Sequence, residues 1–140
     1  MLQWSEALET GDSAIDREHR EIFSRLNDIG AAIDRGADPE ALQHLIHVLL
    51  DYAHRHFRHE EHVMACRRCP LHEANCTAHG SFTARMVHWL AIMNCGVVPT
   101  SLIADIHSEL CEWIQQHIAK IDTGLRSSLA AVPPVAPAMP

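Results

Sequence analysis

Positive charge is scarce in this sequence. Eleven lysines and arginines, of which Lys120 is the one lysine, face eighteen aspartates and glutamates, and the formal net charge at pH 7 is −7. Proteins that bind nucleic acids use clustered Lys and Arg side chains to neutralise phosphates. We therefore expect no nucleic-acid partner.

Long hydrophobic runs are also missing. The longest apolar stretches lie around residues 45–50 and 89–93, far short of the ~20 residues that a membrane span needs. The first residues, Met1–Trp4, have neither the basic start nor the apolar core of a secretion signal. We expect a cytoplasmic protein that does not bind membranes. We expect it to be a monomer, with an oligomer as the alternative.

Several catalytic and cofactor motifs are absent. The six glycines are scattered and form no phosphate-binding loop, and neither a zinc-protease H-E-x-x-H nor a serine nucleophile elbow occurs. No glutamate is followed three residues later by histidine, which disfavours the E-x-x-H sites of ferritin-like proteins. The five cysteines are an odd number, and this argues against a disulfide scaffold.

Glycine and proline instead divide the chain into four long segments, with breaks at residues 36–39, 66–70 and 94–99. Within the segments, apolar residues recur every three or four positions, which is typical of helices. We predict an all-α fold, an antiparallel up-down-up-down four-helix bundle over residues 1–126. Residues 127–140 are rich in Ser, Ala, Val and Pro without any period, and we expect a disordered tail there.

Histidine is abundant, with twelve residues in the chain. Each predicted helix has one histidine within its apolar stripe, and two carboxylates accompany them. These residues are His19, His56, Glu60, His79, His117 and Asp122. In an antiparallel bundle all six positions fall within about three turns of the same end, so they can form one layer.

Such a layer requires compensation of its negative charge, because unpaired carboxylates are costly inside a bundle. Apart from Lys120, no lysine or arginine lies at the inward positions. Neutral imidazoles and carboxylate oxygens suit iron, manganese or zinc, and two bridging carboxylates suit a pair of ions. The alternative is a hydrogen-bonded network of buried histidine and glutamate without metal.

A larger set of short motifs surrounds these residues. It comprises Trp4-Ser5, Gly11, Ile15–His19, His56–Glu61, Met64, Pro70, His79, Phe82, Trp113–Ile118 and Asp122. In combination this set resembles the hemerythrin family, in particular its single-domain bacterial members, over roughly residues 1–125. The resemblance implies a non-haem site with two iron ions, and reversible binding of O2.

The resemblance also implies a role for each residue. His19 and His56 would ligate one iron, His79 and His117 the other, and Glu60 and Asp122 would bridge both. O2, or another small diatomic or peroxide ligand, would bind in an apolar pocket formed by Ile22, Phe57 and Ile114. Asp122 follows His117 by about 140° around an ideal helix, so the last turn of the fourth helix must depart from ideal geometry.

One position departs from the family pattern. The family places a third histidine on the second iron, and this chain has Asn75 there. We expect water or Asn75 to fill that ligand position, with Cys76, His72 or Glu73 as alternatives. A more open second iron favours peroxide or NO chemistry. A di-iron enzyme is therefore the main alternative, although we favour an O2-binding carrier, store or sensor over an enzyme.

The cysteines suggest a third hypothesis. Cys66 and Cys69 have the C-x-x-C spacing of a zinc site or redox pair, and Cys76 follows nearby. A redox or metal-sensing module would use these thiols to report to a partner. We expect instead that Cys66 and Cys69 are loop thiols without a ligand.

Overall fold

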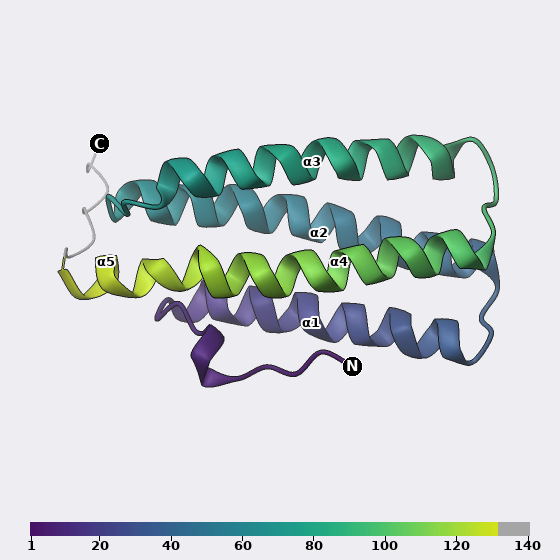
Figure 1. Cartoon of the computed structure of the whole chain (residues 1–140), viewed down its shortest axis with the longest axis horizontal. Coiled ribbons are helices and arrows are strands. Elements are labelled where there is room, and N and C mark those ends of the chain that lie inside the picture. The colour runs from purple at the N-terminus through teal and green to yellow at the C-terminus, as the bar shows by residue number, and fades with distance from the viewer. Residues whose placement is uncertain (132–140) are drawn as a thin grey trace, which may run out of the picture.

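The computed structural model describes residues 1–131, and these residues confirm the predicted all-α four-helix bundle. The long helices are α1 (Ser13–Asp34), α2 (Pro39–Cys66), α3 (His72–Asn94) and α4 (Thr100–Lys120), and they run antiparallel along one long axis (Figure 1). Three short elements complete the described part: the 3-10 turns η1 (Glu6–Leu8) and η2 (Asp122–Gly124), and helix α5 (Leu125–Ala131). None of the described helices has the length and apolar character of a membrane span.

Local chemistry explains where the helices begin and end. The Asp12 side chain accepts hydrogen bonds from the backbone N–H groups of Ala14 and Ile15, both at 3.0 Å, and so caps α1. Pro39 occupies the first turn of α2, where its missing N–H is harmless. Gly36 has a φ of +73° in the turn after α1, a conformation that glycine adopts without strain.

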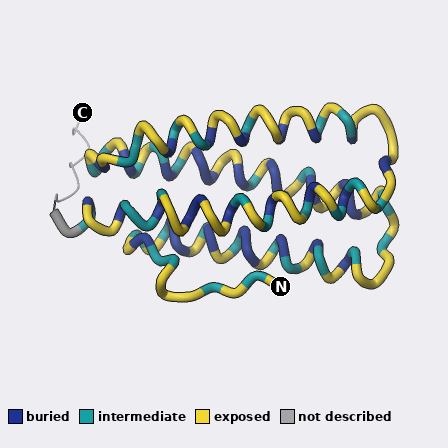
Figure 2. Tube along the Cα trace, in the orientation of Figure 1, coloured by how far each residue is buried: buried dark blue, intermediate teal, exposed yellow. Residues whose placement is uncertain are grey.

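Buried residues form a continuous inward stripe on each long helix, and exposed residues cover the outside (Figure 2). The main apolar core fills most of the bundle and includes Leu26, Leu49, Trp89 and Ile106. A second, smaller apolar cluster contains Met64, Cys69 and Leu125 at the end where α2 meets α3. Along the helices, the polar residues described below lie between these two clusters.

The structure describes residues 127–131, the first part of the stretch in which a disordered tail is expected, as helix. Helix α5 continues to Ala131, because Leu125 is buried and Leu129 packs against the smaller cluster. The guanidinium of Arg126 donates hydrogen bonds to the backbone carbonyls of Glu6, Ala7 and Glu9. These contacts join α5 to the N-terminal segment. The rest of the predicted tail, residues 132–140, lies outside the described residues.

Candidate metal centre

Six buried polar side chains meet at one end of the bundle. Each long helix supplies one imidazole, α2 adds a carboxylate, and η2 adds another. These residues are His19, His56, Glu60, His79, His117 and Asp122. The structure thus brings together all six residues that the sequence analysis placed in one layer. They divide into two halves that share both carboxylates.

The first half, which we call the α1–α2 half, is centred on one oxygen atom. The Nε2 atoms of His19 and His56 each lie 3.0 Å from Glu60 Oε2. His19 Nε2 is also 3.3 Å from Asp122 Oδ2. Two imidazole nitrogens therefore share a single carboxylate oxygen, with the second carboxylate beside them.

The second half, the α3–α4 half, includes an amide. His117 Nε2 lies 3.0 Å from Asp122 Oδ1, 3.0 Å from His79 Nε2 and 2.8 Å from Asn75 Oδ1. Asn75 Nδ2 donates a hydrogen bond of 2.8 Å to Glu60 Oε1, whereas His79 Nε2 is 3.8 Å from the same oxygen. The amide of Asn75 thus bonds the carboxylate oxygen that faces this half.

The other residues considered for this position lie elsewhere. Cys76 Sγ is 3.4 Å from His72 Nε2, both residues are partly exposed, and Glu73 is exposed. None of the three belongs to a described group of side chains that could hold a metal ion. Asn75, by contrast, is fully buried within the cluster. The structure therefore brings Asn75, and not these alternatives, to the position that lacks a histidine.

The C-x-x-C segment forms no metal-binding cluster in the described part of the chain. Cys66 Sγ lies 3.6 Å from His62 Nε2, one helical turn earlier, and Cys69 is buried against Met64 and Leu125. No cysteine belongs to a described group of potential metal ligands. The thiols are free, as expected for cysteines outside a disulfide scaffold.

Two carboxylates outside the cluster contact the Nδ1 atoms of two of its imidazoles. Glu18 Oε1 lies 2.9 Å from His56 Nδ1, and Glu61 Oε1 lies 2.9 Å from His79 Nδ1. Glu18 also lies 2.7 Å from Nδ1 of the half-exposed His59. A carboxylate at Nδ1 fixes the orientation and tautomer of the ring, so that Nε2 faces inward as a lone-pair donor. The sequence analysis missed both, although each directly neighbours a predicted site residue.

The end of α4 departs from ideal helical geometry, as the spacing of His117 and Asp122 predicted. The helix ends at Lys120, Ile121 has φ −116° and ψ −56°, and the 3-10 turn η2 then carries Asp122 inward. Residue 124 in this turn is a glycine, and a Cβ atom at this position would collide with the Leu71 side chain. The second carboxylate of the site therefore depends on a tight turn outside the helix.

His19, His79 and Glu60, three groups of the cluster, have clearly shifted pKa values. Burial opposes a charge on His19, but its contacts with Asp122 and Glu60 outweigh burial and raise its pKa to about 9. For His79 burial prevails and lowers the pKa to about 3. Although burial acts in the opposite direction, the imidazoles of His19 and His56 hold the pKa of Glu60 well below its usual range. Positive charge is thus favoured beside Glu60.

The orientation of the donor atoms fits bound metal ions. Both carboxylate oxygens of Asp122 are buried and lack a well-oriented hydrogen bond, with only imidazole Nε2 atoms at 3.0 and 3.3 Å beside them, and two imidazole Nε2 atoms face each other across 3.0 Å. Lone pairs that converge on one space are satisfied by a cation. Potential ligand atoms lie within 4.8 Å of one another in two groups, Glu60 with His19 and His56, and Glu60 with His79, His117 and Asp122. Nitrogen and oxygen donors of this kind suit first-row transition metals.

An apolar cavity of about 10 Å³ lies next to the cluster. Its walls include Ile22, Phe57 and Ile114, the residues predicted to form a ligand pocket, together with Leu49 and Trp113. The rings of two wall residues stack on imidazoles of the cluster: Phe57 on His79, with centroids 4.0 Å apart, and Trp113 on His117, at 4.4 Å. The cavity is therefore in contact with the α3–α4 half through these rings.

Comparison with known proteins places these residues in a wider context. The family model described as hemerythrin HHE cation binding domain matches residues 10–127, which include the whole cluster. The bacteriohemerythrin of Pseudomonas aeruginosa (strain LESB58) is 27% identical over 123 residues, which span 88% of this chain and 78% of the relative. The bacteriohemerythrin of Stenotrophomonas maltophilia (strain R551-3) is 25% identical over 131 residues, with coverage of 94% and 83%.

Proposed function

Since the chain belongs to the hemerythrin family, we propose that it is a non-haem di-iron protein that binds O2 reversibly, as a carrier, store or oxygen sensor. The observation that carries the proposal is the convergence of four imidazole nitrogens on two buried carboxylates beside an apolar cavity. Four neutral donors and two shared anions suit a pair of divalent or trivalent ions.

We assign the ligands by half. His19 and His56 would hold one iron ion, His79 and His117 the other, and Glu60 and Asp122 would contact both. Iron bound in this way supplies reversible electron transfer to O2. The polypeptide neutralises the positive charge with two carboxylates, and through Glu18 and Glu61 it keeps the rings of His56 and His79 in a fixed orientation.

The apolar residues around the cavity support reversible binding of O2 rather than catalytic turnover. Ile22, Phe57 and Ile114 are each at most 5% exposed and carry no polar side-chain atom. Their cavity of about 10 Å³ is close to the smallest space that holds a single water molecule, and it offers no side-chain hydrogen-bond partner to one. A small apolar ligand is therefore favoured over water, and protons are kept away from it.

The test combines metal analysis with ultraviolet-visible spectra. We expect two iron ions per chain after expression in iron-rich medium, and a spectral change on adding air that reverses when O2 is removed. One zinc ion without iron would contradict the di-iron assignment. An irreversible change would contradict reversible O2 binding and leave the metal assignment standing.

The Asn75 amide favours a second candidate, an enzyme that handles peroxide or NO. An amide oxygen is a neutral and weaker donor than imidazole, so the iron of the α3–α4 half would more readily admit a second small molecule. Consumption of hydrogen peroxide or NO over many turnovers, faster than the decay of the oxygenated form, would favour this candidate over O2 carriage.

A further inference from the structure

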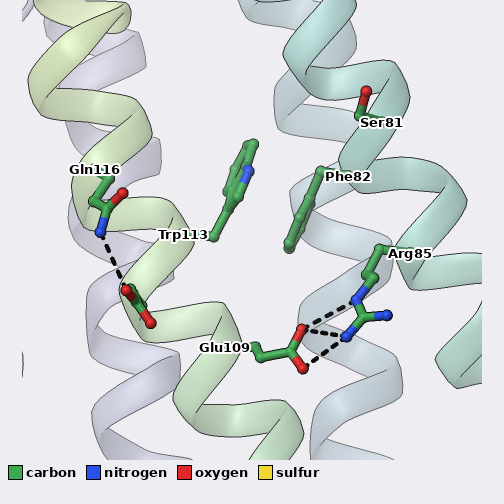
Figure 3. A pocket seen from close by; sticks show the side chains of 7 residues that line it. Ser81, Phe82, Arg85, Glu109, Trp113 and Gln116 are labelled. Carbon is green, nitrogen blue, oxygen red and sulfur yellow. Dashed lines mark hydrogen bonds and ion pairs between the residues drawn. The ribbon is translucent and has the colours of Figure 1, made fainter.

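The apolar cavity is small, and a larger pocket lies beside one of its walls. This surface pocket, of about 390 Å³, is bordered by α3 and α4 and is shown in Figure 3. Its lining residues are Ser81, Phe82, Arg85, Glu109, Glu112, Trp113 and Gln116. Two of them, Phe82 and Trp113, also line the apolar cavity. The two spaces are thus separated by the same pair of aromatic rings.

The rings of Phe82 and Trp113 lie face to face. Their centroids are 3.9 Å apart and their planes differ by 13°, and Figure 3 shows the rings side by side, one from α3 and one from α4. Phe82 is 6% exposed, and Trp113 is partly exposed. A stacked pair of this kind is worth about 1 kcal/mol beyond its buried area. Each ring also contacts another ring, Phe82 that of Trp89 and Trp113 that of His117.

The pair lies in the seam between α3 and α4, where aromatic side chains fill the space between the helices. The backbones of α3 and α4 approach each other less closely than those of the other neighbouring long helices. Across the mouth of the pocket, Arg85 donates hydrogen bonds to Glu109 at 2.7 to 3.1 Å (Figure 3). Both side chains are about half exposed, so this bidentate pair is a solvent-screened tie between α3 and α4. Outward movement of the two rings therefore has to work against this tie and against the packing of the rings on their neighbours.

The other walls of the cavity are less suitable for passage. Leu26 is the one residue that the cavity shares with a different described pocket, between α1 and α4, and it is 1% exposed within the main core. Opening that wall would displace a core side chain that has no exposed neighbour in the cavity wall, whereas the α3–α4 wall pairs the buried Phe82 with Trp113, which is partly exposed at the surface pocket.

We propose that Phe82 and Trp113 form a gate through which O2 passes between the surface pocket and the apolar cavity. This inference rests on the proposed function, because it assigns the route of the ligand to the same site. A gate raises or lowers the barrier for entry and exit alike. It therefore changes the association and dissociation rate constants by one common factor and leaves their ratio, the affinity, unchanged.

The kinetic test uses the reduced, iron-loaded protein mixed with O2 in a stopped-flow spectrometer. Phe82→Leu removes the stack, and we expect both rate constants to rise about fivefold, the factor equivalent to about 1 kcal/mol. Phe82→Trp enlarges the ring, and both should fall. Phe23→Leu is the matched control, since Phe23 is a buried phenylalanine that lines neither space. Unchanged rates in both Phe82 variants, or a changed affinity with one rate unaltered, would overturn the gate.

A second measurement does not depend on iron chemistry. In the zinc-loaded protein, dissolved O2 should enhance the NMR relaxation of the methyl groups of Ile22 and Ile114, which line the cavity. No enhancement would overturn the gate, because O2 would not reach the cavity. If the iron-loaded protein is oxidised irreversibly, the proposal of reversible O2 binding fails. The gate then still predicts that the oxidation rate changes in the two Phe82 variants, and an unchanged oxidation rate would overturn the gate.

Discussion

The two halves of the metal centre have the same number of imidazoles and different surroundings. In the α1–α2 half, His19 and His56 both lie 3.0 Å from Glu60 Oε2. In the α3–α4 half, Glu60 Oε1 accepts a hydrogen bond from Asn75 Nδ2, and His79 Nε2 remains 3.8 Å away. One oxygen of the Glu60 carboxylate therefore faces two imidazoles, and the other oxygen accepts a hydrogen bond from an amide.

Replacement of one ligand residue therefore affects more than the metal ion that it faces. Asparagine lacks the imidazole donor, and its N–H group also competes for a bridging oxygen. A hydrogen bond to a carboxylate is worth about 1.5 to 3 kcal/mol, enough to weaken the second ion relative to the first. We expect the α3–α4 half to release its metal first.

Glu60→Ala should have the largest effect, because this residue serves both halves. We expect the loss of paired metal binding, measured as iron per chain after gel filtration. Glu73→Ala is the matched control on the exposed face of α3, and His44→Ala removes an exposed histidine; both should retain two ions. Two tightly bound ions in Glu60→Ala would refute the assignment of the shared carboxylate.

Asn75→His should make the halves more alike. An added imidazole donor and a released Glu60 oxygen should slow metal loss from the α3–α4 half by about tenfold or more, and should lengthen the life of the oxygenated form. Transfer of iron to a chelator and the decay of the oxygenated spectrum measure the two effects. Asn94→His, at the other end of α3, should change neither. Equal or faster decay in Asn75→His would show that the amide already serves as an adequate ligand.

Substitution of the supporting carboxylates should affect one half at a time. Glu61→Gln weakens the contact with His79 and should lower the metal affinity of the α3–α4 half by about tenfold. Glu18→Gln weakens the contact with His56 and should lower the metal affinity of the α1–α2 half by about tenfold. Titration with iron, followed by absorbance, separates the two ions by affinity. A single common decrease for both ions in either variant would mean that the halves do not act separately.

The sequence was sufficient for the bundle and for the five cluster residues on the long helices, because these features follow from local periodicity, whereas Asp122 reaches the cluster through the turn η2. Each histidine interrupts an apolar stripe of its own helix, so its inward position can be derived without its partners. Glu18 and Glu61 could not be predicted in this way, because they flank the stripe and reach Nδ1 atoms on a neighbouring helix. Cys76 was a plausible ligand by spacing, but its side chain contacts His72 instead.

Helix α5 could not be derived from the sequence for a related reason. Residues 127–131 have no apolar period of their own, and their helix depends on contacts across the whole chain. Arg126 bonds carbonyl groups of residues 6, 7 and 9, more than a hundred positions earlier, and Leu129 packs beside Met64 and Leu125. Composition describes a segment by itself and does not include such distant partners.

Arg126→Ala should have the smallest effect of the series. It removes hydrogen bonds from an exposed guanidinium to the N-terminal segment, and we expect the free energy of unfolding to fall by about 1 kcal/mol. Urea denaturation of the metal-loaded protein measures this change. Arg17→Ala, an exposed arginine on α1, is the control and should be within about 0.5 kcal/mol of the parent protein. An equal decrease in both variants would argue against a specific role for the contact.

The position of Asp122 on η2 has a kinetic consequence for the stored metal. Its carboxylate is attached to a three-residue turn between α4 and α5, and α5 is tied to the opposite terminus by Arg126. Terminal segments open locally far more often than a bundle unfolds globally. We therefore expect local opening of residues 121–129 to be one route of metal release, and amide hydrogen exchange at these residues would measure that opening.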